Sequence, residues 1–485
     1  MNPDFDFDFA VLGGGSAGYA AARTAVSLGL KTAIIDGAEE LGGLCILRGC
    51  MPSKTLIESA NRNLVIRNAS RFGLLASKGE VNTRTIRDRK RTLIGEFAGY
   101  RQQQINDGRF TVIRGTAEFT DSSDDGVSLE VSLREEEGQK RQIKAATALI
   151  ATGSSISIPD VPGLRETGFW TSDTLLDAEQ IPSSFIVLGG GAIALEMAHF
   201  LEGIDREVTV IQRSPHLLTG LDTDLAAVVQ GAFEDRGIKI ACGTRLLRVE
   251  TTPNGSKRVY YQQNGTEQAA EGDEILLALG RTPATATLGL DKIGVDTEKS
   301  GQVSVNHQMR TSNGRIFAAG DVSGPLEVVH LAVQQGEVAA KNAACVLEDA
   351  ALKHRMDYRC KLFGVFTHPQ VAVVGLSEAE ARRHGMPHLV STYPFNDHGK
   401  SMVMDEMEGF VKLLGDPKTG AILGGAVVGP EATELIHEIA IAMHLGATVA
   451  QLASAPHYHP TLSEIWTYPA EDIADQIEIK NDVKI

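Results

Sequence analysis

One glycine-rich pattern occurs twice in the sequence, and this repeat restricts the fold more than any other feature. The pattern, Gly-x-Gly-x-x-Gly or Ala, starts at Gly13 and again 176 residues later at Gly189. Each copy follows a short apolar run, a predicted buried strand, and precedes a helix of small and apolar residues and then a second strand. The repeat predicts an α/β fold with two Rossmann-like dinucleotide-binding domains. The alternative is two glycine turns in an unrelated α/β sheet.

The first copy has every residue type that a dinucleotide site needs. Its glycines, Gly13, Gly15 and Gly18, allow a tight turn and a close approach of the backbone to a pyrophosphate. The start of the following helix supplies N–H groups and positive potential. Asp36 ends the next strand, 23 residues after Gly13, and is expected to accept hydrogen bonds from a ribose. In the second copy Gly189 and Gly191 remain, Ala194 replaces the third glycine, and Gln212 followed by Arg213 stands where the first copy has its acid.

Composition excludes several other classes of protein. With 485 residues, the chain is long enough for about three domains. A net charge of −16 argues against a nucleic-acid partner and against binding to anionic membranes. No stretch reaches the ~18 apolar residues of a membrane span, and the acidic start lacks the basic region of a signal peptide. We therefore expect a cytoplasmic protein with no membrane association.

The close cysteine pair is the main candidate for redox chemistry. Cys45 and Cys50 follow the first strand-helix-strand unit, and a disulfide between them requires a distorted helix, in which Gly49 relieves crowding. In a cytosolic chain such a pair is more often catalytic than structural. Two buried thiols and half a zinc site are the alternatives, although the other three cysteines are isolated along the sequence.

A dithiol needs a base because only the thiolate attacks a disulfide. His459 is the candidate, and Glu464, five residues later, could hold its second ring nitrogen and fix its tautomer. Spacing alone does not select His459 over the other histidines, including His457.

Taken together, these motifs resemble the pyridine nucleotide–disulphide oxidoreductase family of flavoproteins, over nearly the whole chain. Besides the two glycine turns, the motifs are Gly43-x-Cys45-x-x-x-Gly-Cys50-x-Pro-Ser-Lys54, Gly115-Thr-Ala117, Ala151-Thr-Gly153, Gly280-Arg281-x-Pro283, Ala319-Gly-Asp321 and His459-Pro-Thr-x-x-Glu464.

The resemblance implies a role for each matching residue. Cys50 would touch the flavin of FAD and Cys45 would exchange with substrate, while Lys54 would pair with Glu196 beside the flavin and nicotinamide. His459 and Glu464 would act from the other subunit of a homodimer, so that a monomer would be inactive. The FAD-binding residues would be Gly13, Gly15, Ser16, Gly18, Asp36, Gly43, Lys54, Ala117, Thr152, Gly153 and Asp321. The NAD(P)-binding residues would be Gly189, Gly191, Ala194, Gln212, Arg213 and Gly280. No metal site is expected.

The same resemblance places the domains. It implies an FAD-binding domain in two parts, 1–155 and 285–355, an NAD(P)-binding domain at 156–284, and a C-terminal α+β dimerisation domain at 356–485. Within the first part, alternating polar and apolar residues at 118–141 predict exposed antiparallel strands. In the last domain, the spacing of apolar residues predicts a helix at 434–445.

The C-terminal run 432–447 and the His459 motif look most like dihydrolipoyl dehydrogenases. This implies an FAD-dependent enzyme that passes electrons between a lipoyl-type dithiol, the cysteine pair and NAD(P). The absence of any cysteine after Cys360 argues against mercuric reductase and large thioredoxin reductases. Leu47 and Arg48, near the thiols, depart from the family's pattern and could alter substrate choice.

The nicotinamide half departs from the dihydrolipoyl dehydrogenase pattern. Gln212 replaces a Glu that repels a 2′-phosphate, and Arg213 follows it. Because a guanidinium binds phosphate well, NADP(H) is favoured over NAD. The alternatives are an NADPH-dependent reductase of another disulfide, a metal ion or a quinone, and a docking subunit of an oxo-acid dehydrogenase complex.

Overall fold

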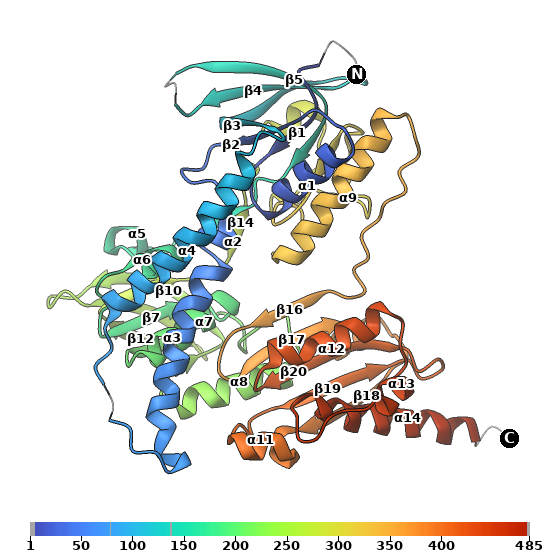
Figure 1. Ribbon diagram of the computed structural model, residues 1–485. Coiled ribbons are helices and arrows are strands. Elements are labelled where there is room, and N and C mark those ends of the chain that lie inside the picture. Colours follow the sequence, from blue (N-terminus) through green and yellow to red (C-terminus); the bar gives the residue numbers. More distant parts are fainter. Residues whose placement is uncertain (1–4, 78, 136–137, 483–485) are drawn as a thin grey trace. The chain divides into compact units, whose positions relative to one another are not determined.

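The computed structural model describes residues 5–77, 79–135 and 138–482 (Figure 1). The chain divides into two compact units. Unit 1 comprises Met1–Ser53, Arg87–Ser157 and Gly280–Asp357. Unit 2 comprises Lys54–Ile86, Ile158–Leu279 and Tyr358–Ile485. The domain boundaries given above stay predictions.

Unit 1 is built on a parallel sheet whose strands run in the order β3, β2, β1, β5 and β15. The bounds are Thr111–Ser122 for β3, Thr32–Asp36 for β2, Phe7–Leu12 for β1, Lys140–Ile150 for β5 and Ile316–Ala318 for β15. Helices α1 (Ser16–Ser27) and α9 (Val329–Leu347) pack side by side (Figure 1). Their backbones nearly touch, because a Cβ added to Gly336 would lie 2.2 Å from the carbonyl oxygen of Ala17.

Beyond the parallel part, β3 and β5 continue into an antiparallel ribbon with β4 (Val127–Leu133). The predicted antiparallel strands are thus present, but the expectation that they are exposed was wrong for one face. Val127, Leu129 and Val131 are at most 2% exposed, because alternate side chains of β4 point into the core of unit 1.

The other elements of unit 1 are short, apart from two helices that cross between the units. Within unit 1 lie α2 (Leu44–Leu47), β6 (Ser154–Ile156), β14 (Arg281–Pro283) and η2 (Leu290–Ile293). The crossing helices are α3 (Cys50–Asn68) and α4 (Thr83–Ile105), and η1 (Ala69–Phe72) follows α3 in unit 2.

Unit 2 contains a second parallel sheet, in the order β13, β7, β8, β9, and a three-stranded antiparallel sheet, β10, β11, β12. The bounds of the first sheet are Glu274–Leu277, Ser184–Leu188, Glu207–Ile211 and Lys239–Ala241, and those of the second are Thr244–Thr251, Lys257–Gln263 and Thr266–Gly272. Its helices are α5 (Leu164–Thr167), α6 (Ser172–Asp177), α7 (Ala192–Gly203) and α8 (Thr223–Asp235). Strand, glycine turn, helix and strand follow one another as in unit 1, which confirms the predicted α/β fold with a repeated unit.

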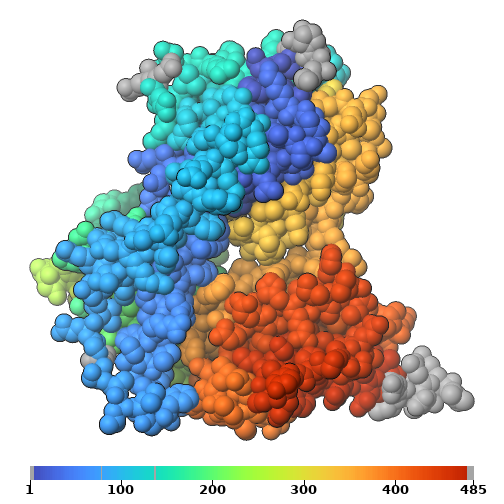
Figure 2. Space-filling view, viewed as in Figure 1, coloured from blue at the N-terminus to red at the C-terminus, as the bar shows by residue number. Residues whose placement is uncertain are grey.

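The C-terminal part of unit 2 is an antiparallel sheet in the order β16, β17, β20, β19, β18. The bounds are Leu362–Val365, Gln370–Gly375, Ile422–Gly429, Phe410–Gly415 and Leu389–Pro394. Its helices are α10 (Glu378–Arg383), η3 (Phe395–Asp397), α11 (Gly399–Met404), α12 (Ala432–His444), α13 (Val449–Ser454), η4 (Ser463–Trp466) and α14 (Thr467–Asp482). These residues, orange to red, form one continuous body in the space-filling view (Figure 2). The predicted helix 434–445 is α12.

Two buried polar clusters also stabilise unit 2. Lys412 on β19 is 2% exposed, and its ammonium contacts the carboxylates of Asp222, Asp224 and Glu378. His199 on α7 is fully buried. Its Nδ1 lies 3.2 Å from Nη1 of Arg236, and its Nε2 lies 2.8 Å from the side-chain oxygen of Asn61. Burial, reinforced by Arg236, holds the pKa of His199 well below 6.5.

Candidate functional site

The first glycine turn, in unit 1, has no room for side chains. Gly13 has φ +103°, its N–H donates to Ile35, and a Cβ on it would lie 2.4 Å from the carbonyl oxygen of Ala151. A Cβ on Gly18 would lie 1.9 Å from the carbonyl oxygen of Gly13. No side chain caps the N-terminus of α1, so its first N–H groups are directed at the turn, as a bound pyrophosphate requires.

Asp36 also holds the turn itself in place, which the sequence did not indicate. Its carboxylate is buried and accepts hydrogen bonds from the backbone N–H groups of Gly14 at 2.7 Å and Ala38 at 2.8 Å. Because each carboxylate oxygen can accept a second hydrogen bond, the side chain can still receive a ribose hydroxyl.

Asp321 belongs to a hydrogen-bonded chain within unit 1. Ser154 donates its hydroxyl to Asp321 at 2.7 Å, and Arg281 donates to the Ser154 hydroxyl, also at 2.7 Å. Burial and the nearby Asp321 raise the pKa of Glu327. Neither Ser154 nor Glu327 was selected from the sequence, because their connection to Asp321 depends on the tertiary fold.

The remaining FAD candidates of unit 1 lie at turns, at the start of α1 and within β3. Gly43 packs on the first glycine turn, since a Cβ on it would come 2.6 Å from the Cα of Gly15. Thr152 donates its hydroxyl to the carbonyl oxygen of Ala284. Ser16 is the first residue of α1, and Ala117 lies on β3. Gly153 has φ +71°, which glycine adopts most readily, and the NAD(P) candidate Gly280 has φ +108°.

The cysteine segment has the predicted break in the helix. Cys45 lies in α2 and is half-buried, whereas Cys50 is the exposed first residue of α3. Arg48 and Gly49 separate the two helices, and a Cβ on Gly49 would lie 3.1 Å from the Cα of Cys45. Glycine therefore lets the chain turn tightly between the cysteines. The helix N-terminus at Cys50 favours a thiolate.

The second glycine turn, in unit 2, repeats the first. Gly189 has φ +119°, and a Cβ on it would lie 2.2 Å from the carbonyl oxygen of Ala278. The helix nevertheless accommodates Ala194, which is fully buried.

Gln212 and Arg213 occupy the end of the neighbouring strand. Gln212 packs over Gly190, as Asp36 packs over Gly14, and its amide donates to the Thr219 hydroxyl at 3.2 Å. The side chain of Arg213 is exposed and has no partner among the described residues.

Lys54 and Glu196, which are 142 residues apart, form a close ion pair in unit 2. The ammonium of Lys54 lies 2.7 and 2.9 Å from the two carboxylate oxygens, and Glu196 is 4% exposed. Phe366 contacts both residues. Its backbone N–H donates to the carboxylate of Glu196 at 3.0 Å, and its ring centroid lies 4.6 Å from the Lys54 ammonium. No sequence motif indicated Phe366.

The structure distinguishes the two histidines that the sequence could not. His457 has both ring nitrogens engaged, by Ala455 at 2.9 Å and by Glu438 at 2.6 Å. Nδ1 of His459 lies 2.9 and 3.1 Å from the carboxylate oxygens of Glu464. Its ring is 77% exposed, and Nε2 has no partner within the described part of the chain. Only His459 therefore offers a free basic nitrogen backed by a buried carboxylate, because Glu464 is 8% exposed.

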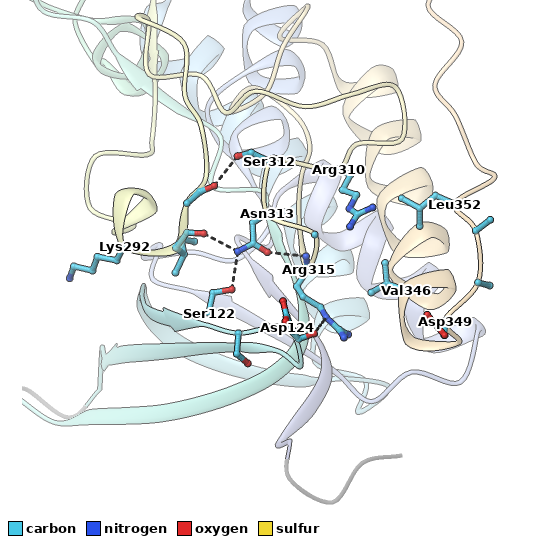
Figure 3. Close-up of a pocket in the computed structure, with 16 residues that line it drawn as sticks. Ser122, Asp124, Lys292, Arg310, Ser312, Asn313, Arg315, Val346, Asp349 and Leu352 are labelled. Atoms are coloured by element: carbon cyan, nitrogen blue, oxygen red, sulfur yellow. Dashed lines mark hydrogen bonds between the residues drawn. The ribbon is translucent and has the colours of Figure 1, made fainter.

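A polar cavity of about 710 Å³ also opens on unit 1, bordered by Ser122, Lys292, Arg310 and Asn313 (Figure 3). Asn313 is held between Ser122, to which it donates, and the backbone of Arg315. None of the 16 lining residues is cysteine or histidine, so the cavity has no group for thiol exchange.

Comparison with known proteins identifies the chain's relatives. The family model for pyridine nucleotide-disulphide oxidoreductases matches residues 7–336, and the model for the dimerisation domain of the same family matches 363–470. The chain belongs to the pyridine nucleotide-disulphide oxidoreductase family. It is therefore an oxidoreductase of a flavoprotein family whose members bind FAD and NAD(P). This confirms the family and the cofactors predicted from the sequence.

The similar proteins carry several names, among them dihydrolipoyl dehydrogenase, mercuric reductase and leghemoglobin reductase. A dihydrolipoyl dehydrogenase of Thermus scotoductus is 34% identical, covering 97% of this chain and 98% of the relative. A mercuric reductase of Staphylococcus aureus is 32% identical, and the match covers 96% of this chain and 82% of the relative. Among solved structures, LpdA from Mycobacterium tuberculosis matches with a TM-score of 0.84 and 28% identity. The match covers 96% of this chain and 99% of LpdA.

No helix in the described part is long and apolar enough to cross a membrane. No group of three or more potential metal ligands occurs among the described residues.

Proposed function

We propose that this oxidoreductase acts on dithiols and disulfides of the lipoyl type, as a dihydrolipoyl dehydrogenase does, with Cys45 and Cys50 as its redox-active pair. The observation that carries this proposal is the His459–Glu464 pair. Its exposed, unpartnered Nε2 is the proton acceptor that a thiol substrate needs. The full-length similarity to dihydrolipoyl dehydrogenases supports the same substrate class.

The residues of unit 1 fit FAD. The glycine turn is a cradle that any Cβ would fill, and the uncapped start of α1 faces it. We propose that Gly13, Gly15, Ser16, Gly18, Asp36, Gly43, Ala117, Thr152, Gly153 and Asp321 hold the cofactor, and that Lys54 is a further FAD-binding residue. FAD, when bound, supplies the transfer of two electrons between the cysteine pair and NAD(P).

The protein's own groups carry out the thiol exchange. In the direction of dithiol oxidation, Nε2 of His459 accepts the proton of a substrate thiol. The resulting thiolate attacks the sulfur of Cys45, and the bond to Cys50 breaks, leaving Cys50 as a thiolate. The second substrate thiol then attacks the first substrate sulfur and breaks its bond to Cys45, and the departing Cys45 sulfur takes up the proton of that thiol. This yields the substrate disulfide and the reduced pair. Two electrons have passed from substrate to protein.

The dimerisation domain supports a homodimer. We propose that His459 and Glu464 of one subunit serve the cysteines of the other, so that separated monomers are inactive. The Lys54–Glu196 pair is proposed to lie beside the flavin and nicotinamide, and Gly189, Gly191, Ala194 and Gly280 to contact NAD(P).

The first experiment replaces one sulfur. Cys45→Ser removes the atom that the substrate attacks, so lipoamide turnover should be lost while the purified protein keeps its flavin absorbance. Cys242→Ser, at a half-buried cysteine outside the pair, is the matched control and should retain activity. Full lipoamide turnover by Cys45→Ser would contradict the proposal.

One alternative function has a specific observation in its favour. The mercuric reductase of S. aureus is nearly as similar as the dihydrolipoyl dehydrogenases, and the exposed guanidinium of Arg213 suits a 2′-phosphate. These favour an NADPH-dependent reductase of another disulfide, a metal ion or a quinone. Rates should be compared for lipoamide, oxidised glutathione, Hg²⁺ and a soluble quinone. A rate with any of the last three that exceeds the rate with lipoamide would replace the first proposal with this one.

A further inference from the structure

A second histidine, His398, lies next to Glu464 of the His459–Glu464 pair. His398 is the residue before α11, it is fully buried, and its Nε2 lies 3.4 Å from Oε1 of Glu464. Its Nδ1 lies 2.9 Å from the hydroxyl of Ser401, which is also fully buried. Glu464 is thus placed between two imidazoles, one exposed and one buried.

The contacts of His398 determine which nitrogen carries its proton. Nε2 is buried and has no hydrogen-bond partner of good geometry among the described residues, and the Glu464 carboxylate lies 3.4 Å from it. A lone pair on Nε2 would face that negative charge and would be repelled. The Ser401 hydroxyl can donate to Nδ1, so the favourable arrangement places the proton on Nε2, directed at Glu464.

His398 also stays neutral in this environment. Burial lowers its pKa, and the opposing effect of Glu464 does not overcome burial; His459 lowers the pKa further. A backbone hydrogen bond with Thr461 also raises the pKa of His398 without overcoming burial, and Glu464 is in electrostatic range of His457. A neutral donor orients the carboxylate without cancelling its charge, so Glu464 keeps its full attraction for His459.

We propose that His398 is a positioning residue that donates Nε2–H to Glu464 and thereby fixes the carboxylate on Nδ1 of His459. His398 lies 66 residues from Glu464 along the chain, and no sequence motif indicates a link between them. The link resembles the outer partners that hold metal-bound histidines, whose loss typically costs 10–100-fold in function. For catalysis, the inference rests on the proposed role of His459 as base.

The consequence is a particular tautomer of His459. With Glu464 held on Nδ1, neutral His459 carries its proton on Nδ1 and leaves Nε2 free to accept one from a thiol. Free histidine in water prefers the other tautomer. The Nδ1–H tautomer of His459 therefore reports directly on how well Glu464 is oriented.

The test compares three variants of the FAD-loaded enzyme by ¹⁵N-histidine NMR, with His459 assigned through its loss in His459→Gln. His398→Leu fills the same space without a donor and should shift neutral His459 toward the Nε2–H tautomer. His398→Gln places an amide donor near the position of Nε2 and should restore the Nδ1–H tautomer. His384→Leu makes the same change at an exposed histidine at the end of α10 and should have no effect.

Kinetics supplies the second readout. In His398→Leu, kcat for lipoamide should fall roughly 10-fold with KM little changed, and His398→Gln should recover most of it. A folded, FAD-loaded His398→Leu enzyme with the wild-type His459 tautomer would overturn the inference. If wild type turns over no lipoamide while the tautomer shifts as expected, the proposed function fails and the positioning role stands.

Discussion

The closest backbone contact at the first glycine turn allows a sharp test of FAD binding. In Gly18→Ala, the new methyl group would lie 1.9 Å from the carbonyl oxygen of Gly13 and 3.0 Å from a side-chain carbon of Val11. Cβ atoms in proteins essentially never approach closer than 3.0 Å, so the turn and α1 must separate by about 1 Å. The backbone that must move is the one that would hold the pyrophosphate.

Forced overpacking of this kind costs about 1–3 kcal/mol. If that cost falls on the FAD-bound form, the Kd for FAD rises by roughly one to two orders of magnitude, since each 1.4 kcal/mol is tenfold. The assay is flavin absorbance per mole of purified protein, followed by titration of the apoprotein with FAD. Gly95→Ala is the matched control: Gly95 lies in α4 of the same unit with nothing within 4 Å, so alanine should keep FAD and stabilise the helix slightly. A Gly18→Ala protein that binds FAD as tightly as wild type would refute the reasoning.

Three further predictions concern unit 2. Arg213→Gln should raise KM for NADPH by roughly 10-fold and leave KM for NADH unchanged, because a charged hydrogen bond to phosphate contributes about 1.5–3 kcal/mol. Equal effects on KM for both nucleotides would contradict a phosphate contact. Lys412→Met should destabilise the protein by about 3–5 kcal/mol, measured by urea unfolding, because the buried Asp222 loses its ion pair and keeps hydrogen bonds from the backbone N–H groups of Glu378 and Ala379; an unchanged midpoint would show that the carboxylates are hydrated. His199 stays neutral when folded, whereas the unfolded chain takes up a proton below pH 6.5, so the free energy of unfolding should fall as the pH drops through 6.5. His199→Gln should lose that part of the pH dependence, and a wild-type slope in the variant would assign it to other groups.

The fold could be predicted from the sequence where local geometry decides it. At Gly13 and Gly18 a side chain would meet backbone atoms of the same turn, so the glycines alone indicated the turn and the strand and helix around it. The break between Cys45 and Cys50 was predictable for the same reason, because Gly49 is needed within a few residues. The antiparallel strands near residue 130 were predicted correctly, but the prediction that they are exposed was wrong for one face, since the burial of Leu129 depends on distant core residues of unit 1.

The sequence by itself determined the dinucleotide turns, the cysteine pair and the family, because each depends on residue types a few positions apart. Only the tertiary structure decided that His459 rather than His457 has an unpartnered ring nitrogen among the described residues. It also decided that Phe366 contacts both Lys54 and Glu196, and that His398 lies next to Glu464. Those contacts join residues far apart along the chain or depend on which side chains are buried. The physical reason is that periodicity and spacing encode which face of an element is apolar, whereas the hydrogen bonds of a buried polar group depend on what the whole fold packs against it.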